Sequence, residues 1–318
     1  MTAIIKLNDI LPAIESIDVV AAMEEGFVQY SNGNTVVPPV GELLFDNPKG
    51  DAHIKYGYIK DDEFYCIKIA SGFYENTKLG ISSSQGLMLL FNQKTGEPVA
   101  ILLDEGKLTD IRTAAAGALA AKYFAPKNVK AIGIIGTGIQ ARLQLEYLQK
   151  ITNCKTVWIW GRNPQNTNDF KNEIEPSYDV HIASSPSELA SYCNLIVTTT
   201  PSVTPLLQAN DILPGTHITA VGSDTSEKQE LASQLLHKAN IIIADSISQS
   251  KSRGEIYRAT NENAINSKKV VELGKAIQDT SLQRTSEDQI SIVDLTGVAV
   301  QDIMIATAVY KNYLSNKD

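Results

Sequence analysis

The sequence predicts an α/β protein in two parts: a doubly wound parallel sheet and a smaller α+β domain. Its 318 residues, 43% hydrophobic and 20% charged, suffice for one large domain or two ordinary ones. Short apolar segments lie between turn signals up to residue 125, whereas buried strands alternate with helices from residue 126 on. We therefore expect one domain over residues 1–125, completed by about residues 295–318, and a second over residues 126–294.

The first domain is predicted to contain a mixed or antiparallel sheet. Residues 64–69 and 86–91 are short apolar runs bounded by polar turn residues, a pattern typical of strands. Residues 110–124 are rich in alanine, begin with an aspartate and end shortly before Pro126, which predicts a helix. The C-terminal segment 301–314 has apolar residues at helical spacing, and we expect it to pack on this domain.

The second domain is predicted to contain a parallel sheet covered by helices on both faces, because strands joined by helical crossovers run parallel. The expected strands are 131–135, 156–160, 195–199, 217–221, 240–244 and 290–293, and the expected helices start at Gln140 and near Asn166.

Charge and cysteine content limit the partners and the location. The 28 basic and 36 acidic residues give a net charge of −8, which argues against nucleic acid as a partner. Cys66, Cys154 and Cys193 have neither a C-x-x-C pair nor metal-ligand spacing, so we expect reduced thiols. The N-terminal residues lack a signal-peptide pattern, and no apolar run reaches the roughly 18 residues of a membrane span. These observations predict a cytoplasmic protein that does not bind membranes.

Residues 134–141 contain a G-x-G-x-x-A pattern between a predicted strand and a predicted helix. In a dinucleotide site Gly136 makes the tight turn, Gly138 lets the pyrophosphate approach the backbone, and Ala141 allows helix and strand to pack closely. The pattern alone is weak, since glycines are common in such turns, but the strand and helix around it fit. We therefore expect a Rossmann-type domain that binds a dinucleotide.

The end of the second strand in such a domain normally offers a carboxylate to the ribose 2′-hydroxyl of NAD. Residues 158–163 instead contain no acidic residue and place Arg162 at this edge. A cation there favours the 2′-phosphate of NADP, so NADP(H) is the preferred cofactor and NAD(H) the alternative. The other interpretation is that Arg162 is an ordinary solvated loop residue.

An ordered set of segments is more specific than any single motif. The segments are residues 104–115, 134–141, 160–162, 220–224 with 230–231, and 297–302. Together they resemble the ornithine cyclodeaminase/mu-crystallin family over nearly the whole chain. The resemblance implies a homodimer that binds NAD(H) or NADP(H) and acts on α-imino or α-amino acids, with the first domain binding substrate and forming the dimer.

The resemblance also implies site residues. Lys68 matches the family's active-site lysine and Arg112 its carboxylate-binding arginine; arginine offers a bidentate fork and lysine a movable point charge. A lysine in a strand more often points to solvent, which is the other interpretation of Lys68. The cofactor site is assigned to Gly136, Thr137, Gly138, Ile139, Gln140, Ala141, Gly161, Arg162, Asn163, Ser84, Thr113, Thr199 and Val221.

Asp224 matches the catalytic aspartate of the cyclodeaminases, where the mu-crystallins have a small hydroxyl residue. A carboxylate near the reacting nitrogen stabilises an iminium ion or handles its proton. The alternative role is an aspartate in a loop or at a helix N-terminus after a buried strand.

Two departures from the family pattern concern the substrate. Residues 37–42 lack the arginine that the family often has after a proline, and Lys55 stands where ornithine-specific members have a glutamate. Lys55 would repel the distal ammonium of ornithine and either replaces the missing arginine or binds a second carboxylate. The alternative is a solvated edge residue and an alignment in error by one or two positions. Ser82–Ser84 are phosphate contacts or ordinary turn serines, and the four histidines have no metal spacing, so no metal is expected.

These inferences predict an enzyme: an NAD(P)H-dependent reductase of small cyclic or linear α-imino acids, such as Δ1-pyrroline-2-carboxylate going to L-proline. Lys68, Arg112 and Lys55 would bind the carboxylate. The alternatives are an ornithine cyclodeaminase, an alanine dehydrogenase or iminosuccinate reductase, and a non-catalytic binding protein of the mu-crystallin kind.

Overall fold

The structure, a computed structural model, describes residues 2–266 and 269–316. It divides into two compact units, residues 1–112 with 298–318 (unit 1) and residues 113–297 (unit 2). The division falls inside helix α3 (Lys107–Phe124), whereas the sequence placed it after this helix. The ends of the predicted first domain, residues 1, 317 and 318, lie outside the described residues.

Unit 1 is built on a mixed seven-stranded sheet. The strands from β4 to β7 pair antiparallel with their neighbours, β2 and β3 pair antiparallel with β4, and β1 runs parallel to β7. The strands are β1 (Ala3–Lys6), β2 (Thr35–Val36), β3 (Gly41–Asp46), β4 (Lys49–Ile59), β5 (Phe64–Phe73), β6 (Ser84–Asn92) and β7 (Pro98–Leu103).

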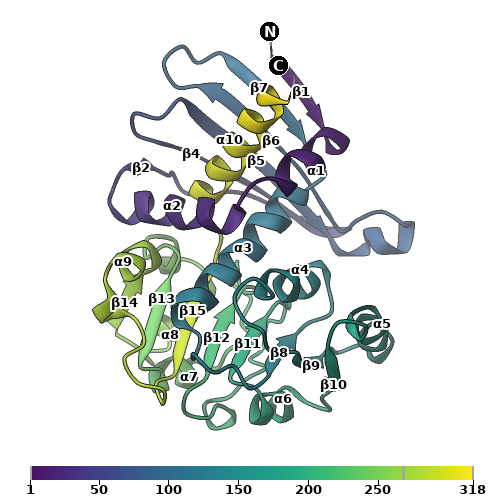
Figure 1. The fold of residues 1–318 in the computed structure, drawn as a ribbon, viewed down its shortest axis with the longest axis vertical. Helices are drawn as coiled ribbons and strands as arrows, with labels where there is room; N and C mark the ends of the chain where they lie inside the picture. The colour runs from purple at the N-terminus through teal and green to yellow at the C-terminus, as the bar shows by residue number, and fades with distance from the viewer. Residues whose placement is uncertain (1, 267–268, 317–318) are drawn as a thin grey trace. The chain divides into compact units, whose positions relative to one another are not determined.

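Helices cover one face of the unit 1 sheet. Helix α10 (Ala299–Ser315) lies across β4, β5 and β6 and also contacts α1 (Leu7–Glu15) and α2 (Val19–Ser31) (Figure 1). The side chains that point to this face, such as Cys66 and Met88, are buried. Segment 301–314, expected to be helical and to pack here, forms most of α10.

The opposite face of the same sheet is apolar and partly exposed. Tyr56, Ile67 and Leu89 occupy directly opposed positions on β4, β5 and β6. Tyr65 and Phe91 form the next row, and their rings stack with centroids 4.8 Å apart. Tyr56 is 39% exposed, so water reaches this surface, which we call the open sheet face.

Unit 2 contains an eight-stranded parallel sheet in the order β10-β9-β8-β11-β12-β15-β13-β14 (Figure 1). The predicted fold class, a Rossmann-type doubly wound sheet beside a smaller α+β part, is confirmed. The order reverses between β8 and β11, which creates a switch point at the carboxyl ends of these strands. The strands are β8 (Ile132–Ile135), β9 (Thr156–Trp160), β10 (Asp179–Ile182), β11 (Leu195–Thr198), β12 (His217–Ala220), β13 (Ile241–Ala244), β14 (Val270–Glu272) and β15 (Ser291–Asp294).

The remaining helices of unit 2 connect these strands. They are α4 (Ile139–Leu148), α5 (Pro164–Ile174), α6 (Pro186–Tyr192), α7 (Ser233–Lys238), α8 (Gly254–Asn261) and α9 (Leu273–Gln278). The apolar core of this unit includes β11, β12 and β13 residues such as Ile196, Ile218 and Ile242. Burial on both faces explains why the strands read as continuous apolar runs in the sequence.

Two helices begin earlier than the sequence predicted, and in both cases a polar side chain is the reason. Helix α3 begins at Lys107, and the Asp104 carboxylate accepts a hydrogen bond of 2.8 Å from the Leu108 backbone. Helix α5 begins at Pro164, because Asn163 caps it and accepts from the next two free amides. Both helices therefore gain a capped first turn.

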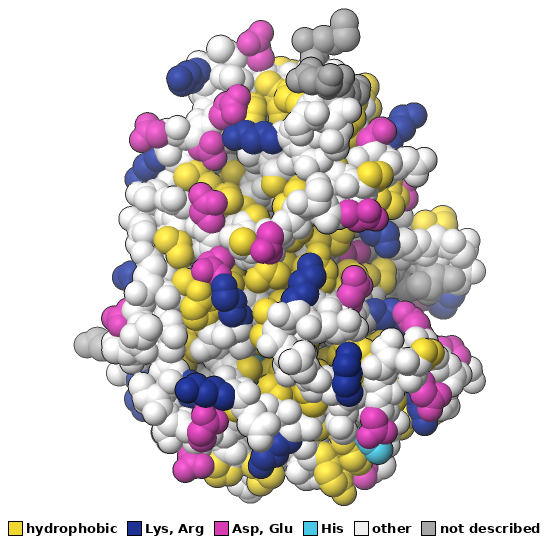
Figure 2. Space-filling model, viewed as in Figure 1, with side chains coloured by type: hydrophobic (Ala, Val, Ile, Leu, Met, Phe, Trp, Pro, Cys, Tyr) yellow, Lys and Arg dark blue, Asp and Glu magenta, His cyan; other side chains and the backbone are white. Residues whose placement is uncertain are grey.

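The face of the molecule shown in Figure 2 carries Lys and Arg side chains interspersed with Asp and Glu side chains. Within the described residues, no helix combines the length and apolar character needed to cross a bilayer. The three cysteines, all in the described part of the chain, are free thiols.

Candidate functional site

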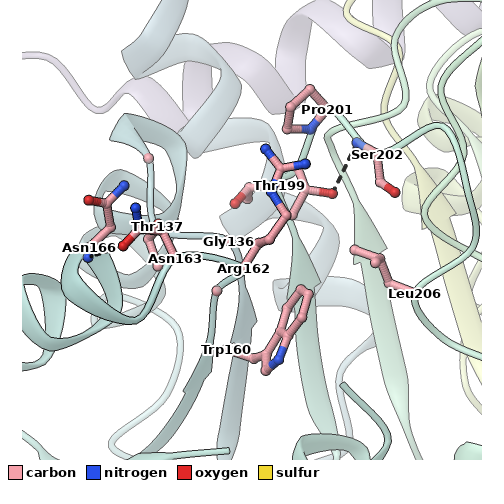
Figure 3. A pocket seen from close by; sticks show the side chains of 13 residues that line it. Gly136, Thr137, Trp160, Arg162, Asn163, Asn166, Thr199, Pro201, Ser202 and Leu206 are labelled. Atoms are coloured by element: carbon pink, nitrogen blue, oxygen red, sulfur yellow. Dashed lines mark hydrogen bonds between the residues drawn. The ribbon is translucent and has the colours of Figure 1, made fainter. Parts of the chain in front are cut away.

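A pocket of about 280 Å³ lies at the switch point of the unit 2 sheet, where the ends of β8, β9 and β11 meet (Figure 3). Seven of the predicted cofactor residues line it. The lining residues are Gly136, Thr137, Gly138, Trp160, Gly161, Arg162, Asn163, Asn166, Thr199, Thr200, Pro201, Ser202 and Leu206.

The glycine turn between β8 and α4 forms one wall. Gly136 has a φ of +125°, and a Cβ there would collide with the Thr199 hydroxyl, so glycine is required for two reasons. Gly138 caps α4 without a side-chain hydrogen bond, and a Cβ there would meet open space. The first amides of α4 therefore face a free volume, which fits the pyrophosphate of a dinucleotide.

Arg142 stabilises this turn through its guanidinium, and the sequence analysis did not identify it. Its guanidinium donates to the carbonyl of Thr137 at 2.6 Å, and its Nε pairs with Glu173 at 2.6 Å. The guanidinium also lies 4.7 Å from the centre of the Phe170 ring. The sequence signal that could have identified Arg142 is its place in the first turn of the helix that follows the glycine-rich turn.

Arg162 lies on the loop after β9 and extends toward Thr199 and Pro201 (Figure 3). Asn163 and Asn166 lie near Thr137 in this view. Among the lining residues, all in the described part of the chain, Arg162 is the one cation, and none is a carboxylate.

Six predicted cofactor residues do not line the pocket. Ala141 and Val221 are buried, while Gln140 and the Thr113 carbonyl both accept from the Gln144 side-chain amide. Ile139 is the first residue of α4, and Ser84 is the first residue of β6 in unit 1. Conversely, sequence analysis missed the wall formed by residues 200–206, because it follows β11 without a glycine pattern.

Unit 1 contains a buried charged cluster on the face that α10 covers. The Lys68 ammonium lies 3.6 Å from the Asp302 carboxylate, and Arg112 Nε lies 3.1 Å from the other oxygen of Asp302. Arg112 also donates to Gln301 at 3.1 Å. The side chain of Lys68 is only 2% exposed, so it does not point to solvent.

Lys55 belongs to the same face, because it is the direct partner of Lys68 in the pairing of β4 and β5. It is 7% exposed and therefore is not a solvated edge residue. Two residues before it on the same face, His53 Nε2 lies 2.7 Å from Glu42. Burial lowers the pKa of Lys68 from its ordinary value, and the nearby Asp302 carboxylate opposes this shift.

Asp224 follows β12 in unit 2. Its carboxylate accepts a 2.6 Å hydrogen bond from Lys228 and its side chain is 38% exposed. Its backbone carbonyl accepts from Arg253 at 3.2 Å. Asp224 therefore lies in a partly solvated loop, where Lys228 holds its carboxylate, and it does not cap a helix.

A parallel sheet of this order, with a glycine turn and an open helix N-terminus at its switch point, is typical of dinucleotide-binding α/β proteins. The chain belongs to the ornithine cyclodeaminase/mu-crystallin family, whose family model matches residues 2–317. Members of this family are NAD(P)-dependent oxidoreductases or cyclodeaminases.

Three relatives illustrate the range of the family. An uncharacterised cyclodeaminase of Sinorhizobium fredii is 36% identical over 310 residues, which are 96% of this chain and 93% of that protein. An archaeal alanine dehydrogenase, solved as a dimer with bound NAD, is 32% identical with a TM-score of 0.90, covering 100% of this chain and 97% of that one. The Δ1-pyrroline-2-carboxylate reductase of Thermococcus litoralis, in complex with NADH and L-proline, is 27% identical with a TM-score of 0.92, covering 99% and 98%.

Proposed function

We propose that the protein is an NAD(P)H-dependent reductase of small α-imino acids, with Δ1-pyrroline-2-carboxylate as substrate and L-proline as product. The observation that carries the proposal is the pair of buried lysines, Lys55 and Lys68, at directly opposed positions with Arg112 on the same carboxylate as Lys68. A substrate carboxylate bound beside these three cationic side chains would accept charge-assisted hydrogen bonds from them.

Each residue of the cluster has a distinct role in this proposal. Arg112 binds the carboxylate through its planar fork, and Lys68 contributes a point charge to the same group. Asp302 holds both side chains in position from the first turn of α10 and raises the pKa of Lys68 against the lowering effect of burial. Lys55 takes the anion-binding role of the arginine that residues 37–42 lack.

The reaction requires a hydride, which a reduced nicotinamide supplies to the imine carbon when the cofactor is bound. Asp224 stabilises the iminium form of the substrate through its carboxylate, which Lys228 keeps in place. Catalysis then depends chiefly on orientation and on complementary charge.

We propose NADP(H) as the preferred cofactor. The support is that Arg162 is the cation on the pocket wall at the end of β9, among the described residues, where an NAD site normally has a carboxylate. Thr137, Gly138 and the first amides of α4 would hold the pyrophosphate. The two solved relatives hold NAD or NADH, so both cofactors belong in the assay.

A reaction on linear substrates is the second candidate. The alanine dehydrogenase is 32% identical to this chain, against 27% for the pyrroline-2-carboxylate reductase. Lys55 would in that case bind the second carboxylate of a substrate such as iminosuccinate. An ornithine cyclodeaminase is disfavoured, because a buried lysine at position 55 repels the distal ammonium of ornithine.

We propose a homodimer that forms through the open sheet face of unit 1. This face combines Tyr56, Tyr65, Ile67, Leu89 and Phe91 in two rows of opposed positions. Contiguous apolar surface of this kind marks interfaces in soluble proteins, and the archaeal alanine dehydrogenase is described as a dimer. Sedimentation of the protein at low concentration tests the assembly.

The function is tested by following nicotinamide absorbance with NADPH or NADH and three substrates: Δ1-pyrroline-2-carboxylate, pyruvate with ammonia, and iminosuccinate. Ornithine with an ammonia readout forms a fourth arm. We expect fastest oxidation with the cyclic imine, and loss of at least about 100-fold in kcat/KM for Lys68→Ala and Arg112→Ala. Lys94→Ala, an exposed lysine on the β6–β7 turn, is the matched control. Full activity of the Lys68 and Arg112 variants would contradict the assigned roles.

A further inference from the structure

The pocket wall formed by residues 199–206 is tied to one buried side chain, that of Glu230. One carboxylate oxygen, Oε1, accepts from the Thr200 amide at 2.6 Å and from the Thr200 hydroxyl at 2.7 Å. Thr200 lines the pocket beside Thr199 and Pro201. The start of the wall is therefore fixed by two hydrogen bonds to one oxygen of Glu230.

The second oxygen of Glu230 connects two strands. Oε2 accepts from the Thr198 hydroxyl at 2.7 Å and from the Gly222 amide at 2.9 Å. Thr198 ends β11, and Gly222 follows β12, so the carboxylate spans both strand ends. A Cβ on Gly222 would collide with the Thr200 backbone and come within 2.6 Å of the carboxylate, which shows how closely these parts are packed.

The backbone of Glu230 fixes the far end of the same wall. Its carbonyl accepts from the amides of Leu206 and Leu207 at 2.7 and 3.2 Å. Its own amide donates to the buried carboxylate of Glu255 at 2.7 Å. Both ends of the segment therefore hydrogen-bond to Glu230, which is itself held by Glu255 and has no exposed surface.

We propose that Glu230 is a positioning residue for the cofactor: it holds the 199–206 wall in the shape that binds the dinucleotide. The inference rests on the proposed function, because it takes the pocket to be a dinucleotide site. A carboxylate suits this role better than an amide, since both of its oxygens accept and each here faces two donors. Burying it is costly unless those bonds are made, which makes the arrangement sensitive to substitution.

The first test measures amide hydrogen exchange without any cofactor, in the wild type, Glu230→Gln and Glu230→Ala. We expect exchange of residues 199–207 to rise at least about tenfold in Glu230→Gln and more in Glu230→Ala, because an amide keeps about half of the acceptors. Exchange of β8 should stay unchanged. An unaltered segment, or an equal rise throughout unit 2, would overturn the positioning role.

Thr200→Val provides a milder variant in case the Glu230 variants do not fold. It removes one hydroxyl donor to Glu230 and keeps the backbone amide. Thr204→Val is its matched control, since Thr204 lies exposed in the same segment and does not line the pocket. Faster exchange in Thr200→Val alone supports the proposal, and equal exchange in both variants contradicts it.

The second test titrates NADPH by fluorescence and measures steady-state kinetics. We expect Glu230→Gln to raise the Kd and KM for NADPH about tenfold or more, while kcat at saturating NADPH changes less than about twofold. If Glu230 had a merely structural role, Glu230→Gln would lower the melting temperature without raising the KM for NADPH relative to kcat. Failure of the wild type to bind a dinucleotide would contradict the proposed function instead. The exchange experiment uses no cofactor, so it tests the positioning role of Glu230 independently of the proposed function.

Discussion

Replacing Asp302 by asparagine should destabilise unit 1 strongly, because this carboxylate contacts two buried cations. Its oxygens lie 3.6 Å from the Lys68 ammonium and 3.1 Å from Arg112 Nε, and its side chain is 1% exposed. With an effective dielectric constant of about 20, each pair at this distance is worth roughly 4–5 kcal/mol of Coulomb attraction. Breaking a buried pair on one side typically costs about 3–5 kcal/mol, since the other charge stays buried.

The assay is urea unfolding of Asp302→Asn beside Glu63→Gln. Glu63 pairs with Lys311, also on α10, at 3.5 Å, but both side chains are more than half exposed. We expect a loss of about 3 kcal/mol or more for Asp302→Asn and less than about 1 kcal/mol for Glu63→Gln.

The same variant should also change the pH dependence of activity. The Asp302 carboxylate raises the pKa of Lys68 against the lowering effect of burial, so its loss lets Lys68 deprotonate at lower pH. The basic limb of the kcat/KM profile should then move to lower pH. Equal stability of the two variants and an unmoved basic limb would refute the reasoning.

Four further predictions follow from individual side chains. Arg162→Ala should raise the KM for NADPH about tenfold or more and leave that for NADH nearly unchanged, and equal effects on both would exclude 2′-phosphate recognition. Gly138→Val should abolish dinucleotide binding with little change in melting temperature, because a Cβ there meets open space; tight binding would contradict the placement of the pyrophosphate. Burial raises the pKa of Glu230 to about 7 and that of Asp294 to about 8. Because the folded state then holds more protons than the unfolded one, the free energy of unfolding should fall by several kcal/mol, in order of magnitude, between about pH 5 and 8.5. A melting temperature that rises with pH over this range would contradict this expectation. Ile67→Asp should convert the dimer to monomer in sedimentation, and an unchanged assembly would exclude the open sheet face as the interface.

The sequence alone determined the fold class of unit 2 and six of the eight strands of its sheet, because their signals are local, whereas the short edge strands β10 and β14 were not predicted. Fully buried parallel strands are continuous apolar runs, and the glycine turn at Gly136 needs a backbone conformation that few other residues adopt. Seven of the predicted cofactor residues accordingly line the pocket. Helix starts were placed less well, since Asp104 and Asn163 act as caps from outside the helical pattern.

Only the tertiary structure decided the contents of the charged cluster. The pairing register of β4 and β5 brings Lys55 opposite Lys68, and a shift by one residue would put Lys55 on the open sheet face. Asp302 reaches both Lys68 and Arg112 from the far end of the chain, a contact that no local pattern encodes. In unit 2, the same holds for Glu230, whose four donors come from two separate segments, residues 198–200 and Gly222, and meet only after the parallel strands have assembled. Local periodicity thus specified the elements, whereas strand register and long-range packing specified the chemistry between them.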